Sequence, residues 1–132
     1  MLESTRLNYA GWIANADVPQ AFADHRMTVH VPRRPYVDAL PGIPTIRVFE
    51  ALACGIPLVS APWRDEENLF RIGSDFLMAR NSNEMARHLN AIRNDADLAR
   101  GLAESGLQRI RDRHTCAHRV DELFAILERI GE

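Results

Sequence analysis

The segment from Pro44 to Ser60 constrains the fold of this chain more than any other. It begins with a proline, continues as an apolar stretch at helical spacing, and reaches Gly55 just before a second proline and a short apolar run. Proline is favoured in the first turn of a helix, and glycine is common just beyond a helix end. The segment therefore predicts a helix that begins at Pro44 and ends before Gly55, followed by a short buried strand of sequence PLVSA.

Glu50 is the only acidic residue in this predicted helix. A carboxylate beside a parallel sheet needs a polar partner, a ligand or water, because burying an unpaired charge is costly. Arg47 lies three residues earlier, so one interpretation is an ion pair within the helix, worth about 0.2–0.5 kcal/mol. The alternative is a carboxylate that accepts two hydrogen bonds from a ligand diol such as ribose. The residues alone leave both interpretations open.

The composition is that of an ordinary single-domain protein. The 132 residues, of which 46% are hydrophobic and 26% charged, are enough for one domain with a proper core, spanning residues 1–132. The net charge of −2 provides no overall basic field for a nucleic acid. All 16 basic residues are arginine. Codon usage in a GC-rich genome is the simpler explanation for this, and selection for phosphate binding is the alternative.

The sequence indicates neither a metal centre nor a membrane segment. Cys54 and Cys116 give no disulfide framework and no metal-ligand spacing, and His25 and His30 have no partner at ligand spacing. No apolar run approaches the roughly 20 residues of a membrane span, and the N-terminus lacks the apolar core of a signal peptide. We expect a cytoplasmic protein that carries no metal and no cofactor.

Apolar runs and helix breakers predict strands that alternate with helices. The expected strands are Leu7–Ile13, Met27–Pro32, Pro57–Ala61 and Phe76–Ala79. A short helix is expected after Asn15 or Asp17, and a loop from Arg33 to Ile43. This order predicts an α/β fold: a partial Rossmann-like, doubly wound parallel sheet of about four strands, flanked by helices and followed by a C-terminal helical segment.

Three helices are expected in the C-terminal half. Asn81, with Glu84 three residues later, is a capping signal for a helix to about Asn94, and Asp95 or Asp97 begins a second helix. Thr115 is a natural cap for the last helix. In that helix, five apolar residues fall on one stripe, which we expect to pack against the body of the domain: Val120, Leu123, Phe124, Leu127 and Ile130.

The segment after the second predicted strand has the most residues suited to binding a ligand. Ligands of open α/β sheets bind beyond the carboxyl ends of the strands. Arg33 and Arg34 follow that strand directly, and ten residues later the chain enters the helix whose free N–H groups, near Thr45 and Ile46, favour an anion. Two arginines and a helix start suggest a diphosphate site. The alternative is that both arginines are solvated loop residues.

The central block IPTIRVFEALACGIPLVSAPW resembles the donor-binding region of GT-B glycosyltransferases of group 1, the retaining kind that includes glycogen synthase. The family pattern has two glutamates eight residues apart, followed by Ala-x-Ala-x-Gly-x-Pro-x-Val. The second half of that pattern is matched here by Glu50, Ala51, Ala53, Gly55, Pro57 and Val59. The runs RHT and HR between residues 113 and 119, together with VPRRP and LPG, resemble the spore-maturation-protein-like branch. The resemblance extends over nearly the whole chain, from residue 9 onward.

The resemblance implies roles for individual residues. In such enzymes the second glutamate binds the ribose hydroxyls of a nucleotide sugar, which assigns that role to Glu50. Backbone amides at the start of its helix bind the diphosphate, which assigns that role to Pro44, Thr45 and Ile46. With Arg33, Arg34 and Arg47, these residues form the expected donor site, and no residue of this chain is assigned to catalysis.

Two departures from the family pattern limit what is expected. The first glutamate, which faces the sugar in the family, would fall at Gly42. The chain also matches only the later part of the second half of a GT-B enzyme, so we expect the acceptor half and two strands of the donor half to be missing. Missing central strands would leave unpaired sheet edges, and pairing of two chains as a homodimer would cover them.

The leading hypothesis is therefore a donor-domain fragment of a glycosyltransferase. Its partners would be a nucleotide diphosphate sugar and an N-terminal acceptor half, and its parent would transfer the sugar to an acceptor that the sequence does not name. The alternative is a non-catalytic binding or assembly module that retains the glycosyltransferase fold. Gly42, in the place of the sugar-facing acid, favours that alternative.

Overall fold

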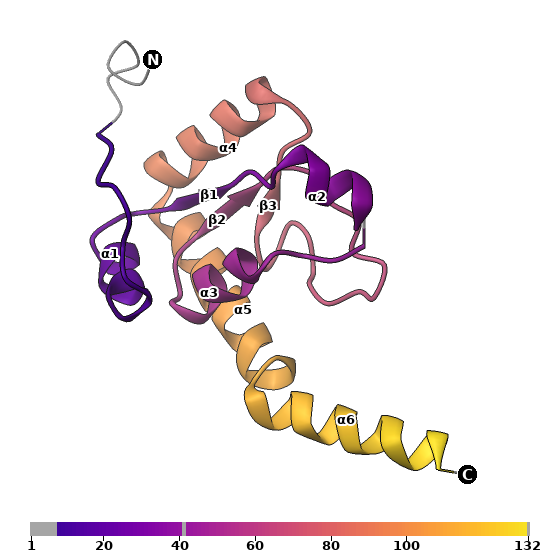
Figure 1. Ribbon diagram of the computed structural model, residues 1–132. Coiled ribbons are helices and arrows are strands. Elements are labelled where there is room, and N and C mark those ends of the chain that lie inside the picture. Colours follow the sequence, from indigo (N-terminus) through magenta and orange to yellow (C-terminus); the bar gives the residue numbers. More distant parts are fainter. Residues whose placement is uncertain (1–7, 41, 132) are drawn as a thin grey trace.

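The computed structural model of the chain describes residues 8–40 and 42–131. Its centre is a parallel sheet with the strand order β1-β2-β3 (Figure 1). The strands are β1 (Thr28–His30), β2 (Leu58–Ser60) and β3 (Leu77–Met78). Thr28 lies opposite Leu58 in the register of the first pair, and Val59 lies opposite Leu77 in the second. The predicted α/β fold with a parallel sheet is confirmed.

Helices connect and cover these strands. In chain order the helical elements are the short 3₁₀ helix η2 (Asn15–Asp17), α1 (Val18–Ala23), α2 (Arg34–Ala39), α3 (Ile46–Ala53), α4 (Ser82–Asn94), α5 (Ala96–Arg113) and α6 (Cys116–Ile130). Helices α3 and α4 lie on opposite faces of the sheet, and α5 packs against both of them (Figure 1). Strand β2 lies between these layers, and all three of its residues are buried.

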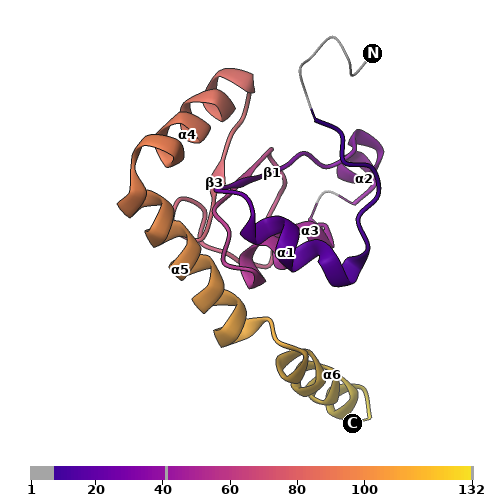
Figure 2. The same ribbon diagram turned by 90° about the vertical axis from the view of Figure 1, so that its left-hand side faces the viewer.

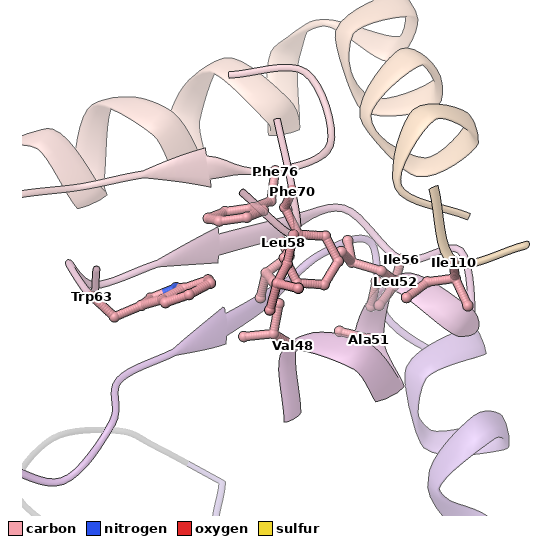
Figure 3. Close-up of a cluster of buried hydrophobic side chains, with 10 residues drawn as sticks. Val48, Ala51, Leu52, Ile56, Leu58, Trp63, Phe70, Phe76 and Ile110 are labelled. Carbon is pink, nitrogen blue, oxygen red and sulfur yellow. The ribbon is translucent and has the colours of Figure 1, made fainter. Parts of the chain in front are cut away.

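Two hydrophobic clusters lie on the two faces of the sheet because successive residues of a strand point to opposite faces. Leu58 belongs to the cluster beneath α3, and its neighbour Val59 belongs to the cluster beneath α4. On α3 the buried residues Val48, Ala51 and Leu52 lie at helical spacing, which explains why this stretch folds as a helix against the sheet (Figure 3).

Aromatic rings fill the α3 side of the core (Figure 3). Phe70 and Phe76 pack edge to face with their centroids 6.0 Å apart, and Trp63 stacks on Phe76 at 6.3 Å. Helix α5 approaches this core closely at Gly106. A Cβ atom at that position would lie 2.7 Å from Leu52 Cδ2 and 2.9 Å from the carbonyl oxygen of Asp75, so only glycine fits there.

The helix predicted from Pro44 begins two residues later than expected. Thr45 has an extended backbone (φ −75°, ψ 158°) and precedes the first helical residue, Ile46. The predicted helix end is confirmed. Gly55 has φ +65°, its N–H bonds the Leu52 carbonyl at 3.1 Å, and the Ile56 N–H bonds the Ala51 carbonyl at 3.2 Å. These two bonds form a Schellman motif, which satisfies carbonyls that the last turn would leave free.

Two predictions for the N-terminal third are wrong. The expected strand Leu7–Ile13 is not formed over residues 8–13, and Leu7 lies outside the described residues. The described part of the sheet therefore has three strands rather than about four, and Trp12, within the expected strand, is 85% exposed. The expected loop from Arg33 to Ile43 contains the helix α2, whose first turn holds Pro35. Proline is compatible with that position because its missing N–H has no partner there in any helix.

The starts of α4 and α5, which were predicted from the capping residues Asn81 and Asp95, are confirmed. Asn81 Oδ1 accepts the Glu84 N–H at 2.9 Å, and Asp95 Oδ1 accepts the N–H groups of Asp97 at 3.0 Å and Leu98 at 2.9 Å. Side-chain acceptors of this kind satisfy the first N–H groups of a helix. They fix the starts of α4 and α5 independently of the rest of the fold.

The last helix points away from the domain (Figures 1 and 2). The apolar stripe predicted to pack against the body is instead exposed, from 49% at Val120 to 76% at Ile130. The chain changes direction at His114, whose Nε2 lies 3.0 Å from the Leu69 carbonyl, and no described element runs along the apolar face of α6. Among the described residues, no helix is long and apolar enough to cross a membrane.

Candidate functional site

A crevice opens beside the carboxyl end of β1, between α2 and the start of α3. Its volume is about 540 Å³. The end of β1 and the following residues, 28 to 32, form one wall, and five other residues complete the lining: Phe22, Arg33, Tyr36, Thr45 and Arg47. This is where the topology of an open α/β sheet places a ligand.

The start of α3 presents free N–H groups at this crevice. Thr45 stands at the N-cap position, but its side chain makes no capping hydrogen bond. The Val48 N–H bonds the Thr45 carbonyl at 3.2 Å, whereas the N–H groups of Ile46 and Arg47 have no acceptor among the described residues. Free N–H groups and the helix dipole give this end of α3 a partial positive charge.

His30, at the end of β1, organises the side chains beneath α3. It is 5% exposed. The single hydroxyl proton of Ser60 is donated to the Ala61 carbonyl at 2.8 Å, so Ser60 Oγ accepts the Nδ1–H of His30 at 2.9 Å. In the neutral ring Nε2 is then an acceptor, and the Thr45 hydroxyl donates to it at 2.8 Å. This tautomer is assigned from the hydrogen-bond network.

The electrostatics of the site favour the neutral imidazole. Burial lowers the pKa of His30, and the positive charge of Arg47 lowers it further. His30 is therefore an uncharged acceptor for Thr45 at neutral pH. Positive charge at the crevice comes instead from the guanidinium groups of Arg33 and Arg47.

Glu50 lies one turn after Arg47 on α3. Its Oε2 is 3.2 Å from Arg47 Nη1, so the ion pair proposed from the sequence is formed. The contact is not aligned as a hydrogen bond, and Oε2 is buried without a hydrogen-bond partner although the side chain as a whole is 32% exposed. Arg47 also lies over the ring of Phe22, with its guanidinium carbon 5.9 Å from the ring centroid. Arg47 lines the crevice, whereas Glu50, its partner in the ion pair, does not.

The structure brings together some of the residues predicted from the sequence. Arg33, Thr45 and Arg47 line one crevice, and the backbone of Ile46 lies at the adjacent helix start. The Ile46 side chain is 68% exposed, and Pro44 precedes the N-cap residue. Arg34 is the first residue of α2 rather than part of a loop.

Sequence reasoning missed His30 and Ser60 as members of the site. The available signal was positional: each is the last residue of a strand, and the two lie opposite each other in the register. Polar side chains at the carboxyl ends of neighbouring parallel strands meet at one edge of the sheet. The sequence alone makes His30 a candidate metal ligand at most, and it has no partner at metal-ligand spacing.

A second hollow lies beyond the ends of β1 and β2. Its parts have volumes of about 530 and 460 Å³, and their lining includes Asp38, Trp63 and Arg64. Nearby, the carboxylate of Glu66 lies over Gly42, where a Cβ atom would be 2.9 Å from Glu66 Oε2. Glu66 therefore fills space that a side chain at position 42 would need.

Other candidate residues have structural partners. Thr115 Oγ1 lies 2.7 Å from His118 Nδ1 and does not cap α6, contrary to the prediction. His114 packs against the rings of Phe49 and Phe70. Within the described ranges, no three His, Cys, Asp or Glu side chains cluster as they would to hold a metal ion.

Comparison with known proteins identifies the family. Residues 3–125 match the model of a family described as glycosyl transferase-like. The chain belongs to this glycosyl transferase-like family. A solved structure of sucrose-phosphate synthase from Thermosynechococcus elongatus is similar to it, with a TM-score of 0.74 and 16% identity over 96% of this chain. No curated protein matches the chain at a significant level.

These findings confirm the resemblance to group 1 glycosyltransferases of the GT-B fold. At 16% identity the structural match establishes the fold alone. The chain spans about 30% of the length of the sucrose-phosphate synthase chain. In this glycosyltransferase-like domain the crevice beside α3 occupies the sheet edge at which open α/β folds hold their ligands.

Proposed function

We propose that this domain binds a nucleotide diphosphate sugar as the donor-binding part of a glycosyltransferase. Family membership supports the class of reaction, and one observation carries the assignment of the site. The start of α3 has free N–H groups at Ile46 and Arg47 and faces a crevice that is also lined by the side chains of Arg33 and Arg47. Free amides and guanidinium groups are the donors that bind diphosphates.

Each predicted donor residue has a role in this proposal. The diphosphate lies against the backbone from Pro44 to Ile46 and receives hydrogen bonds from Arg33, Arg34 and Arg47. Glu50 accepts hydrogen bonds from the ribose hydroxyls. Its side chain is 32% exposed, and Arg47 contacts Oε2 at 3.2 Å without hydrogen-bond alignment, so a ribose would have to displace Arg47 to reach this carboxylate. Arg47 then moves from the Glu50 carboxylate toward the phosphates.

The chemistry that such a site supports is the departure of a diphosphate. In glycosyl transfer the bond between the sugar's anomeric carbon and the diphosphate oxygen breaks, and an acceptor hydroxyl forms the new glycosidic bond and loses its proton. Donors fixed at the leaving oxygens stabilise the charge that develops there. The family expectation is retention of configuration. We place the acceptor in an N-terminal half outside these 132 residues, and the reaction in the cytoplasm.

A non-catalytic binding or assembly module is the second candidate. Position 42 is glycine, and the Glu66 carboxylate lies over it. A site without the sugar-facing acid could hold a nucleotide without transferring the sugar. Nucleotide binding without sugar release in the presence of the parent protein's acceptor half would favour this candidate.

Calorimetry with UDP, GDP and ADP tests the nucleotide assignment. We expect one of them to bind, and Glu50→Ala to weaken that binding about tenfold or more, because hydrogen bonds to a charged group contribute about 1.5–3 kcal/mol. Glu128→Ala, an exposed acid on α6, is the control and should bind as the wild type does. Equal binding by wild type and Glu50→Ala would defeat the ribose assignment.

Homodimer formation is a further part of this proposal. Strand β1 is at the edge of the described sheet. Val29 within this strand is 42% exposed, and Val31, just after it, is 69% exposed. A free strand edge with apolar side chains favours pairing with a second chain. We expect light scattering to show a dimer that dissociates on dilution. A monomer at every concentration would contradict this.

A further inference from the structure

The hydrogen bond between Thr45 and His30 explains why α3 begins without a cap. A threonine at the N-cap position normally accepts the N–H of the second or third helical residue with its hydroxyl. Here that hydroxyl donates to Nε2 of His30 at 2.8 Å, and it makes no capping hydrogen bond. The helix thus contains a suitable capping residue whose side chain is held elsewhere.

The residue that holds Thr45 is itself fixed. His30 is 5% exposed, and its other nitrogen bonds Ser60 Oγ at 2.9 Å. Ser60 is fully buried and is held in turn by the Ala61 carbonyl at 2.8 Å. The chain of bonds from Ala61 to Thr45 has one donor and one acceptor at every step. It therefore sets the orientation of the Thr45 hydroxyl from within the core.

A separate feature of the crevice points to an anionic ligand. Arg33 lines the crevice next to His30 and Thr45 and has no carboxylate partner among the described residues. Its guanidinium group and the free N–H groups of Ile46 and Arg47 are hydrogen-bond donors that border one space. A cation without a protein partner beside open amides is the arrangement expected for a phosphate-bearing ligand.

We propose that His30 is a positioning residue for the diphosphate: by accepting the Thr45 hydroxyl, it keeps the N–H groups of Ile46 and Arg47 open to the ligand. This inference rests on the proposed function. His30 does not touch the ligand and acts through Thr45. If His30 offered no acceptor, the Thr45 hydroxyl would turn to the Arg47 N–H, cap the helix and compete with the phosphate.

Two substitutions of His30 separate this role from a packing role. The amide oxygen of glutamine reaches the place of Nε2 and can accept from Thr45, whereas asparagine supplies a donor near the place of Nδ1 and leaves Thr45 free. For whichever of UDP, GDP and ADP the wild type binds, we expect His30→Asn to weaken binding in calorimetry about fivefold, the equivalent of one capping hydrogen bond. His30→Gln should bind within about twofold of the wild type.

A second substitution at Thr45 provides the decisive comparison. Valine has the shape of threonine but cannot cap, so Thr45→Val, whatever its own affinity, is the reference background in which no hydroxyl competes for the Arg47 N–H. In the double variant His30→Asn/Thr45→Val no hydroxyl competes, and we expect the affinity to return to the level of Thr45→Val. A loss that persists in the double variant, or an equal loss in His30→Gln and His30→Asn, would overturn the role of His30.

Amide exchange measured without ligand keeps this inference separate from the nucleotide assignment. In the free protein the Arg47 N–H should exchange rapidly in the wild type and several-fold more slowly in His30→Asn, where Thr45 caps the helix. Failure of the wild type to bind UDP, GDP or ADP would defeat the proposed function while leaving this readout intact. Unchanged exchange of the Arg47 amide would overturn the positioning role itself.

Discussion

His30 shows how one buried side chain connects the core of this domain to its candidate site. It lies at the end of β1. Its hydrogen bond to Ser60 on β2 sets the tautomer of the ring, and its Nε2 then accepts the hydroxyl of Thr45 at the start of α3. As a result, α3 has no side-chain cap, and the absence of such a cap lowers the stability of other proteins by about 0.5–2 kcal/mol. Such local costs are typical of functional sites, where a residue is held for a ligand rather than for stability.

The lowered pKa of His30 predicts how the stability of the domain depends on pH. Because burial and Arg47 lower its pKa in the folded state, the unfolded chain binds the proton more readily. The contribution of His30 is therefore complete above its unfolded pKa of about 6.5 and is lost as the pH falls through the folded pKa.

Urea unfolding of the wild type and His30→Gln at pH 8 and pH 5 measures this contribution. The wild type should lose more stability than the variant between pH 8 and pH 5. Only in the wild type does residue 30 take up a proton on unfolding at pH 5, and this uptake favours the unfolded state. His25→Gln, the same substitution at an exposed histidine, is the matched control. A wild type and His30→Gln that lose the same stability would contradict the burial of a neutral imidazole.

At the scale of elements, the sequence predicts helix ends that depend on neighbouring residues, but not features that depend on distant partners. The starts of α4 and α5 followed from Asn81 and Asp95, because a cap involves only residues two or three positions away. The end of α3 followed from Gly55 for the same reason. The sequence does not predict α2, because its six residues include a proline and two charged residues and form no apolar stripe.

Two other wrong predictions at this scale concern elements without a partner. Residues 8–13 have a strand-like pattern, but a strand forms only beside another strand, and none of the described strands pairs with them. The stripe on α6 shows a correct helical period, but periodicity says only which face is apolar, not what covers it. In the candidate site, Arg33, Thr45 and Arg47 were predicted, whereas His30 and Ser60 required the register of β1 and β2.

Removal of α6 tests whether this helix contributes to the stability of the domain. Because Leu123, Phe124 and Leu127 are all more than half exposed, a chain that ends at Thr115 loses little buried apolar surface. We expect its free energy of unfolding in urea to be within about 1 kcal/mol of that of the whole chain. Loss of cooperative unfolding on truncation would show that α6 packs on the body in solution.

At the scale of the whole molecule, the sheet and its covering helices present one edge at which the ends of β1 and β2 and the start of α3 converge (Figure 1). The chain belongs to the glycosyl transferase-like family. The structural match to sucrose-phosphate synthase covers 96% of the chain, so the shared fold extends over nearly all of its length. All residues that line the crevice lie between Phe22 and Arg47 of this chain. We therefore expect nucleotide binding by the 132 residues themselves, and sugar transfer only with the acceptor half.

A nuclear magnetic resonance titration of the labelled domain with UDP tests the central claim most directly, with GDP and ADP as parallel arms. For the nucleotide that binds, we predict shifts of the Ile46 and Arg47 amide resonances that saturate, because the diphosphate bonds these N–H groups. The matching nucleoside, which lacks phosphate, should leave both resonances in place. Shifts confined to residues away from the start of α3, or the same shifts with the nucleoside, would contradict a diphosphate site at this helix.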